Sequence, residues 1–172
     1  MKHHIGNFIH DVKEGIIVHG CNAQGVMRSG VAKDIREKWP DAFNVYRNAY
    51  EKHMNERGQS LQLGRVIWYT ASKEPKLAIA NGITQEFYGR EPGRVYVNYD
   101  ALRLVFQNVA KIAKQHNLSV HYPLIGAGLA QGDWGKISSI INEELEGVDH
   151  NLWTLPGMEI PQPKTIDKKQ TP

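Results

Sequence analysis

The chain has 172 residues, of which 41% are apolar and 23% are charged. These values are typical of one globular domain with a hydrophobic core, and they exclude disorder of the whole chain. No apolar run reaches the length that a membrane-spanning helix needs, and no apolar segment follows Met1 to His4 as in a signal peptide. The net charge of +3 is too weak to predict a nucleic-acid partner.

The single cysteine, Cys21, excludes an internal disulfide and fits a reducing compartment. The histidines are scattered, so no familiar zinc-site spacing can be assembled from them. We therefore expect a cytoplasmic protein without a metal ion or a cofactor, and without a membrane or nucleic-acid partner. We also expect it to be a monomer.

The first half of the chain predicts two strands followed by two helices. Met1 to Ile5 is expected to add an edge strand, and the β-branched run Ile16 to Val18 predicts a buried strand. A short helix over Val31 to Lys38 ends at Trp39-Pro40, because the residue before a proline disfavours the helical region. Asp41 is then placed to cap a second helix.

The second half alternates strands with longer helices. Apolar runs predict strands over Val66 to Tyr69, Leu77 to Ala80, Val120 to Tyr122 and Leu152 to Leu155. Apolar residues at helical spacing predict amphipathic helices over 102–113 and 134–145. The acidic residues Asp100 and Asp133 are the expected caps of these two helices.

Strands that alternate with helices indicate an α/β layered domain with a largely parallel sheet. We assign residues 1–156 to this domain. The remaining residues, 157–172, are proline-rich and hold few large apolar side chains, which predicts a tail or an extension along the surface.

Two glycine-rich segments, Val18 to Ala32 and Pro123 to Trp134, each lead from a predicted strand into a predicted helix. Ligands in open α/β sheets bind at the carboxyl ends of the strands. Glycines let backbone amides approach a ligand closely, and a helix N-terminus favours an anion. Two such loops together favour a diphosphate ligand, although each loop alone fits a simple tight turn.

The motifs in these segments resemble those of the macro domain family. Gly30-Val31-Ala32 and the Pro123 to Gly128 segment match the two ligand loops of that family, and Gly6-Asn7-Phe8 stands where many members have Gly-Asp and an aliphatic residue. His19-Gly20-Cys21-Asn22 is similar to the branch that contains the yeast-type ADP-ribose 1″-phosphate phosphatase and small phage and bacterial proteins. The resemblance covers roughly residues 1 to 156.

Membership of this family implies a three-layer α/β/α fold with a mixed, largely parallel sheet. It also implies that ADP-ribose or ADP-ribose 1″-phosphate is the ligand. The ligand-binding residues implied by the motifs are Asn7, Phe8, Gly30, Val31, Ala32, Ile125, Gly126, Ala127, Gly128 and Leu129. Asn7 is expected to read the adenine, and the glycine-rich loops are expected to hold the diphosphate through backbone amides.

His19 and Asn22 are the predicted catalytic residues. Histidine titrates near neutral pH and suits proton transfer, whereas a hydrogen-bonded core histidine is the alternative interpretation. Asn22 has an amide that suits ribose hydroxyls, and the alternative is that this amide shapes the turn. The implied reaction is hydrolysis of ADP-ribose 1″-phosphate to ADP-ribose and phosphate. Removal of ADP-ribose from a modified macromolecule and binding without turnover are the alternatives.

Three departures from the family pattern concern the same cleft. Asn7 replaces an acid that commonly faces the adenine amino group. Arg28-Ser29 stand where two glycines are common, so the arginine is placed either to contact phosphate or to cover the cleft. Ala130-Gln131 replace an aromatic residue and a glycine beside the distal ribose.

Overall fold

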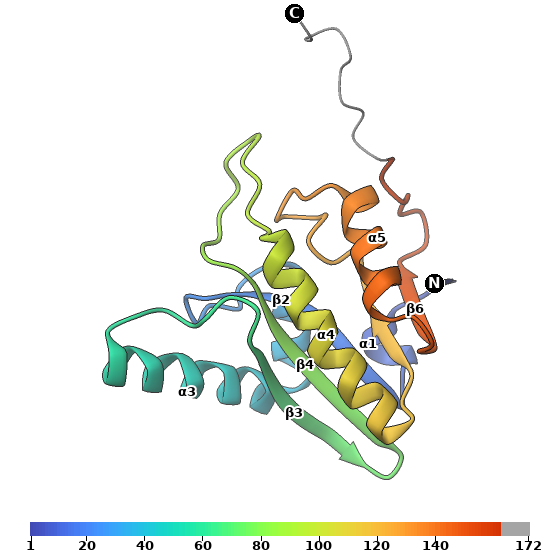
Figure 1. Cartoon of the computed structure of the whole chain (residues 1–172), viewed down its shortest axis with the longest axis horizontal. Helices are drawn as coiled ribbons and strands as arrows, with labels where there is room; N and C mark the ends of the chain where they lie inside the picture. Colours follow the sequence, from blue (N-terminus) through green and yellow to red (C-terminus); the bar gives the residue numbers. More distant parts are fainter. Residues whose placement is uncertain (163–172) are drawn as a thin grey trace, which may run out of the picture.

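The computed structural model describes residues 1–162, and its centre is a six-stranded sheet (Figure 1). The order of the strands is β1-β6-β5-β2-β4-β3, and only the edge pair β3 and β4 runs antiparallel within the described chain. The sheet is therefore mixed and largely parallel, as predicted. The strands are β1 (Lys2–Ile5), β2 (Gly15–Asn22), β3 (Val66–Lys73), β4 (Lys76–Gln85), β5 (Val120–Tyr122) and β6 (His150–Thr154).

Helices cover both faces of the sheet, which confirms the three-layer α/β/α architecture. The helices are α1 (Phe8–Asp11), α2 (Gly30–Lys38), α3 (Pro40–Arg57), α4 (Tyr99–His116) and α5 (Trp134–Glu144). The four-residue helix α1 is too short to give a periodic apolar pattern, and the sequence did not predict it. Among residues 1–162, no helix has the length and apolar character that a membrane crossing requires.

Two of the predicted helix caps are wrong by two positions each. Helix α4 is capped by Asn98, whose side-chain oxygen accepts a hydrogen bond from the Ala101 amide at 2.9 Å, while Asp100 lies in the first turn. Helix α3 begins at Pro40, so Asp41 also lies in a first turn. Proline is favoured at this position because its missing N–H has no helical partner there, and acids in a first turn are favoured by the helix dipole. Asp133 does cap α5, as predicted.

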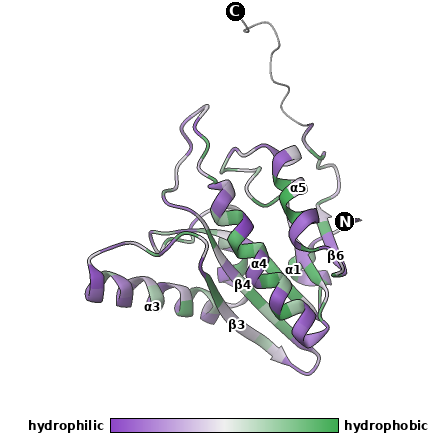
Figure 2. Cartoon of the chain, viewed as in Figure 1, coloured by the Kyte–Doolittle hydropathy of each residue, from purple (hydrophilic) through white to green (hydrophobic). Residues whose placement is uncertain are grey.

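Alternate residues of β2 face the two helical layers. Ile16 and Val18 pack with α4 and α5, whereas Ile17 packs with α1 and α2 on the opposite face. All three are fully buried. Figure 2 shows the corresponding pattern on α4, which is apolar toward the sheet and polar on its outer side. The central strands therefore carry continuous apolar runs, because both of their faces are covered.

The parallel pairing of β2 with β5 places the two glycine-rich loops next to each other. Ile16 pairs with Val120 and Ile17 with His121, so the two strands end at the same edge of the sheet. The first loop leaves β2 toward α2, and the second leaves β5 toward α5, which lies in the other helical layer (Figure 1). A site between the loops thus lies between the two layers of helices.

Candidate functional site

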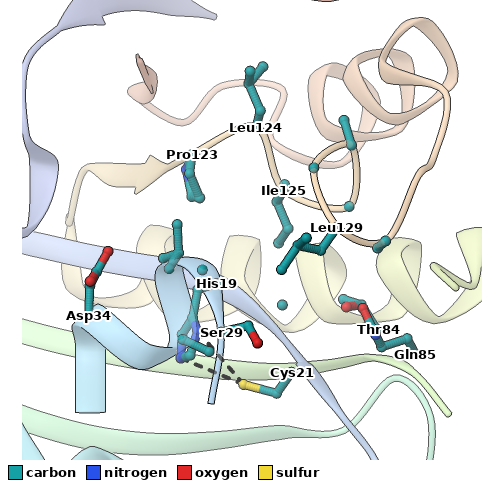
Figure 3. Close-up of a pocket in the computed structure, with 18 of the residues that line it drawn as sticks. His19, Cys21, Ser29, Asp34, Thr84, Gln85, Pro123, Leu124, Ile125 and Leu129 are labelled. Carbon is teal, nitrogen blue, oxygen red and sulfur yellow. Dashed lines mark hydrogen bonds between the residues drawn. The ribbon is translucent and has the colours of Figure 1, made fainter. Parts of the chain in front are cut away.

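A cleft of about 740 Å³ lies between the two glycine-rich loops (Figure 3). Every site residue predicted from the sequence lines this one cleft. They are Asn7, Phe8, His19, Asn22, Gly30, Val31, Ala32, Ile125, Gly126, Ala127, Gly128 and Leu129. Its size and its location at the carboxyl ends of parallel strands are typical of small-molecule sites in α/β proteins.

Asn22 holds the first loop in shape. Its side-chain oxygen accepts hydrogen bonds from the backbone amides of Gln24 at 2.9 Å and Val26 at 3.4 Å, and its Nδ2 donates to the Val26 carbonyl at 2.8 Å. The Tyr46 hydroxyl donates to the Asn22 carbonyl at 2.6 Å. This is the turn-shaping role that the sequence left open as an alternative, and it fixes the loop that faces the ligand cleft.

His19 is buried in the second half of β2, with 1% of its surface exposed. Asn81 donates through Nδ2 to the Ala42 carbonyl at 3.1 Å, so its oxygen is the acceptor that faces His19 Nε2 at 2.6 Å. His19 Nε2 therefore carries the proton, and Nδ1 is the unprotonated nitrogen of the ring. Burial lowers the pKa of His19 to about 4 against the opposing effect of Asn81, so the ring is neutral at pH 7.

Cys21 lies directly beside His19. Its Sγ is 3.6 Å from His19 Nε2 and 3.8 Å from Nδ1, as the dashed lines in Figure 3 indicate. Burial raises the pKa of the Cys21 thiol, so the thiolate is disfavoured. This side chain therefore packs as a small apolar residue.

The second loop depends on a left-handed backbone at Gly126. Its φ is +76°, and a Cβ at this position would lie 3.0 Å from Val97 and 3.1 Å from Ile137. The Gly132 amide donates to the Gly126 carbonyl at 2.7 Å, which closes the loop on itself. Glycine is therefore required by both the conformation and the packing.

One end of the cleft is apolar and lies beside α1. Phe8, Ile9 and Trp153 line it together with the residues that follow β6, namely Leu155, Met158 and Pro161. Met158 and Pro161 fall in the segment predicted to be a tail, so part of this segment contributes to the cleft wall. Residues 163–172 of that segment lie outside the described residues. The apolar residues Leu155 and Met158 are the sequence signal for this contact.

Asn7 at this end has a structural role of its own. Its side-chain oxygen accepts from the Ile9 amide at 3.2 Å and so caps α1, while its backbone N–H donates to Asp11 at 3.0 Å. The residue lines the cleft, and its oxygen is already engaged in the cap. Its expected contact with adenine stays a prediction.

The opposite end of the cleft is polar and basic. Thr84 and Gln85 at the end of β4 line it, followed by Tyr88 and Arg90 from the next loop. Arg28, from the first glycine-rich loop, also lines the cleft. The sequence interpretation named Arg28 but did not name Arg90.

Comparison with known proteins agrees with this geometry. A family model described as "Macro domain" matches residues 18–141, which include both glycine-rich loops. The chain belongs to the macro domain family. This confirms the resemblance inferred from the motifs at residues 18–32 and 123–128.

Individual macro domain relatives are distant. The chain is 26% identical to a DNA ADP-ribosyl glycohydrolase of Thermus aquaticus over 94% of its own length, but it spans only 42% of that protein. It is 24% identical to an ADP-ribose 1″-phosphate phosphatase of Debaryomyces hansenii, over 74% of this chain and 82% of the relative. A solved structure of a protein of unknown function from Bacteroides thetaiotaomicron is 29% identical with a TM-score of 0.76, over 88% and 96% of the two chains.

Proposed function

We propose that the cleft binds ADP-ribose and that the protein hydrolyses ADP-ribose 1″-phosphate to ADP-ribose and phosphate. One observation carries this proposal: two glycine-rich loops from adjacent parallel strands open onto one cleft that all the family-implied residues line. Its volume of about 740 Å³ lies within the range of small-molecule sites. The name of the Debaryomyces hansenii relative supports the reaction.

In this proposal the adenine lies at the apolar end of the cleft, against Phe8 and the residues that follow β6. The backbone amides of Gly30 and Val31 bind the diphosphate from one side, and those of Gly126 to Gly128 bind it from the other. Helix α2 begins at Gly30, so its N-terminal dipole favours the same anion. The terminal ribose then lies toward Asn22 and the basic end.

The reaction is a displacement at phosphorus. Water attacks the terminal phosphorus, the bond from phosphorus to the ribose 1″-oxygen breaks, and that oxygen takes up a proton. His19 is the residue proposed to assist proton transfer, through Nδ1, because Nε2–H is held by Asn81. Asn22 is proposed to position the ribose, with its loop held by Tyr46. Positioning and anion binding would supply most of the acceleration.

The second candidate is removal of ADP-ribose from a modified macromolecule. It is favoured by the name of the Thermus aquaticus relative, which matches along 94% of this chain. The same cleft would hold the ADP-ribose part, and the broken bond would be the one at the ribose 1″-carbon instead of the ester bond to phosphorus. Binding without turnover remains the third alternative, since His19 and Asn22 both have internal hydrogen-bond partners.

Calorimetric titration with ADP-ribose, with AMP and ADP as controls, tests the binding proposal. We expect clear binding of ADP-ribose and much weaker binding of AMP. Phosphate release from ADP-ribose 1″-phosphate and ADP-ribose release from an ADP-ribosylated oligonucleotide then separate the two reactions. Tight binding of ADP-ribose without release of either phosphate or ADP-ribose would identify a binding module. Absence of ADP-ribose binding would contradict the proposed function.

A further inference from the structure

Two arginines that come from separate loops line the cleft. Arg28 belongs to the loop after β2 and Arg90 to the loop after β4, and both line the cleft with exposed side chains. Within residues 1–162, neither guanidinium forms an ion pair, a hydrogen bond or a ring contact. By contrast, Arg94 pairs with Glu91 at 3.2 Å. Arg28 and Arg90 therefore keep all their donors available to a ligand.

The charged side chains that line the cleft are mostly basic. Asp34 is the only carboxylate among the described residues that line it, and it lies on α2, one turn after Gly30. In Figure 3 Asp34 lies on the side opposite to Thr84 and Gln85, the strand end that leads to Arg90. Arg28 adds a second positive charge to the lining. These two arginines favour a bound molecule that carries an anion.

The loop that carries Arg90 is tied to the second glycine-rich loop. Gln131 donates through Nε2 to the Glu91 carbonyl at 2.8 Å and accepts from the Gly93 amide at 3.3 Å. The Tyr96 hydroxyl accepts from the Glu91 amide at 3.2 Å, and the Tyr96 amide donates to the Ala130 carbonyl at 2.8 Å. These bonds hold Arg90 at the cleft even though its loop extends beyond the sheet (Figure 1).

We propose that Arg28 and Arg90 form an anion subsite that binds a phosphate carried on the terminal ribose. The proposal rests on the proposed function, because the adenine must occupy the apolar end for the terminal ribose to lie toward the two arginines. A guanidinium offers paired N–H donors that match phosphate oxygens, and two of them can balance a phosphomonoester dianion. The subsite thereby selects ADP-ribose 1″-phosphate over ADP-ribose.

A phosphodiester of a nucleic-acid strand would present oxygens similar to those of a phosphate on the terminal ribose. A second cavity distinguishes between these two ligands. This groove of about 560 Å³ lies between α2 and α3 and shares Arg28 with the cleft. Its other cations are engaged: Lys33 lies 3.9 Å from Glu37, and Arg36 lies 3.9 Å above the Phe43 ring. The groove therefore offers no row of free cations to follow a strand, which favours a single terminal phosphate.

The test compares two ligands on four proteins: the wild type, Arg28→Ala, Arg90→Ala and the control Lys33→Ala. Calorimetry gives the affinity for ADP-ribose. Stopped-flow displacement of a fluorescent ADP-ribose gives the affinity for ADP-ribose 1″-phosphate before turnover. We expect the wild type to prefer the phosphorylated ligand by tenfold or more. Each arginine variant should lose most of this preference while binding ADP-ribose as the wild type does, and Lys33→Ala should resemble the wild type.

Several outcomes would overturn the subsite. If the arginine variants weaken the binding of both ligands equally, the arginines contact the ADP-ribose part that the two ligands share. If the wild type binds ADP-ribose but shows no preference, the terminal phosphate is not recognised. If a single-stranded octanucleotide displaces the fluorescent ligand in a manner that depends on Arg28 and on salt, a phosphodiester is the ligand. A wild type that binds neither ligand overturns the proposed function itself, which separates the two failures.

Discussion

The chemistry open to His19 depends on its surroundings more than on its residue type. A histidine in water titrates near neutral pH, but burial lowers the pKa of His19 to about 4. Its Nε2–H donates to Asn81, which is in turn fixed by the Ala42 carbonyl. A structural role and a catalytic role therefore coexist in one side chain, and a substitution must separate them.

His19→Gln and His19→Ala make this separation. Glutamine keeps an N–H donor for Asn81, whereas alanine leaves a buried oxygen unpaired, which destabilises the fold by about 1–3 kcal/mol. We expect both variants to lose phosphate release by about 100-fold, and only His19→Ala to lower the urea midpoint strongly. If His19→Gln keeps full turnover, the catalytic assignment of His19 is wrong and its role is structural.

Secondary-structure elements determine where the backbone amides of the site point. Each glycine-rich loop connects a central strand to a helix in a different layer, so the cleft wall consists of backbone held at both ends. The second loop is constrained further by contacts of Gly126 with Val97 and Ile137. Small changes inside these loops should therefore alter binding more than equal changes in other turns.

Gly126→Ala and Gly147→Ala test this expectation as a matched pair. Both glycines have positive φ, +76° and +80°, but a Cβ at Gly147 meets nothing within 4 Å. Alanine in this conformation costs about 1 kcal/mol at either position. We expect only Gly126→Ala to weaken ADP-ribose binding, by tenfold or more in calorimetry, because the second loop must shift. Equal loss of affinity in both variants would show that the loop packing is not the cause.

The contact between the cleft and the segment after β6 can be tested by substitution. Met158 lines the apolar end of the cleft and is 47% exposed, whereas Ile160 is 36% exposed and does not line it. We expect Met158→Ser to weaken binding of both ADP and ADP-ribose by about threefold, as for the loss of one apolar contact. Ile160→Ser should leave both affinities unchanged, and a larger effect of Ile160→Ser would contradict the proposed adenine location.

At the scale of the whole molecule, buried histidines link folding to pH. Burial lowers the pKa of His121 to about 4, and it also lowers the pKa of His150. His121 accepts from Trp153 Nε1 at 3.0 Å, and His150 Nδ1 lies 2.7 Å from the Tyr122 hydroxyl. His19 joins β2 to β4, and the other two rings join β5 to β6, all in their neutral forms.

The native state should therefore lose stability as the pH falls. The unfolded chain binds protons near pH 6.5, while the folded protein resists protonation of His19 and His121 until about pH 4. Stability is thus fully present above pH 6.5 and is lost between 6.5 and 4. We expect urea unfolding followed by tryptophan fluorescence to show a loss of about 2 kcal/mol or more between pH 7 and 4.5.

His121→Gln tests the contribution of one ring to this pH dependence. The variant removes a half-buried ring whose pKa is lowered by burial, so it should reduce the slope of stability against pH, whatever its effect at pH 7. A wild type equally stable at pH 7 and at pH 4.5 would contradict the linkage.

The sequence by itself predicted the six strands, the longer helices and the two loops of the cleft. The apolar runs at 16–18 and 120–122 predicted buried central strands because both faces of such strands are covered by helices. The glycine-rich motifs predicted the two ligand loops because a close backbone approach and a positive φ both favour glycine, which can be read from the sequence. Family membership followed from the same two segments.

Only the tertiary structure decided what each polar side chain is free to do. Asn81 reaches His19 from β4, and Tyr46 reaches Asn22 from α3, so no local pattern showed that these side chains already have partners. Arg90 and Met158 join the cleft through folding of a loop and of the segment after β6. Such contacts join residues that are far apart in the chain, because tertiary packing determines which groups are buried and hydrogen-bonded. The patterns that predict strands and turns, by contrast, depend on residues that are adjacent in the sequence.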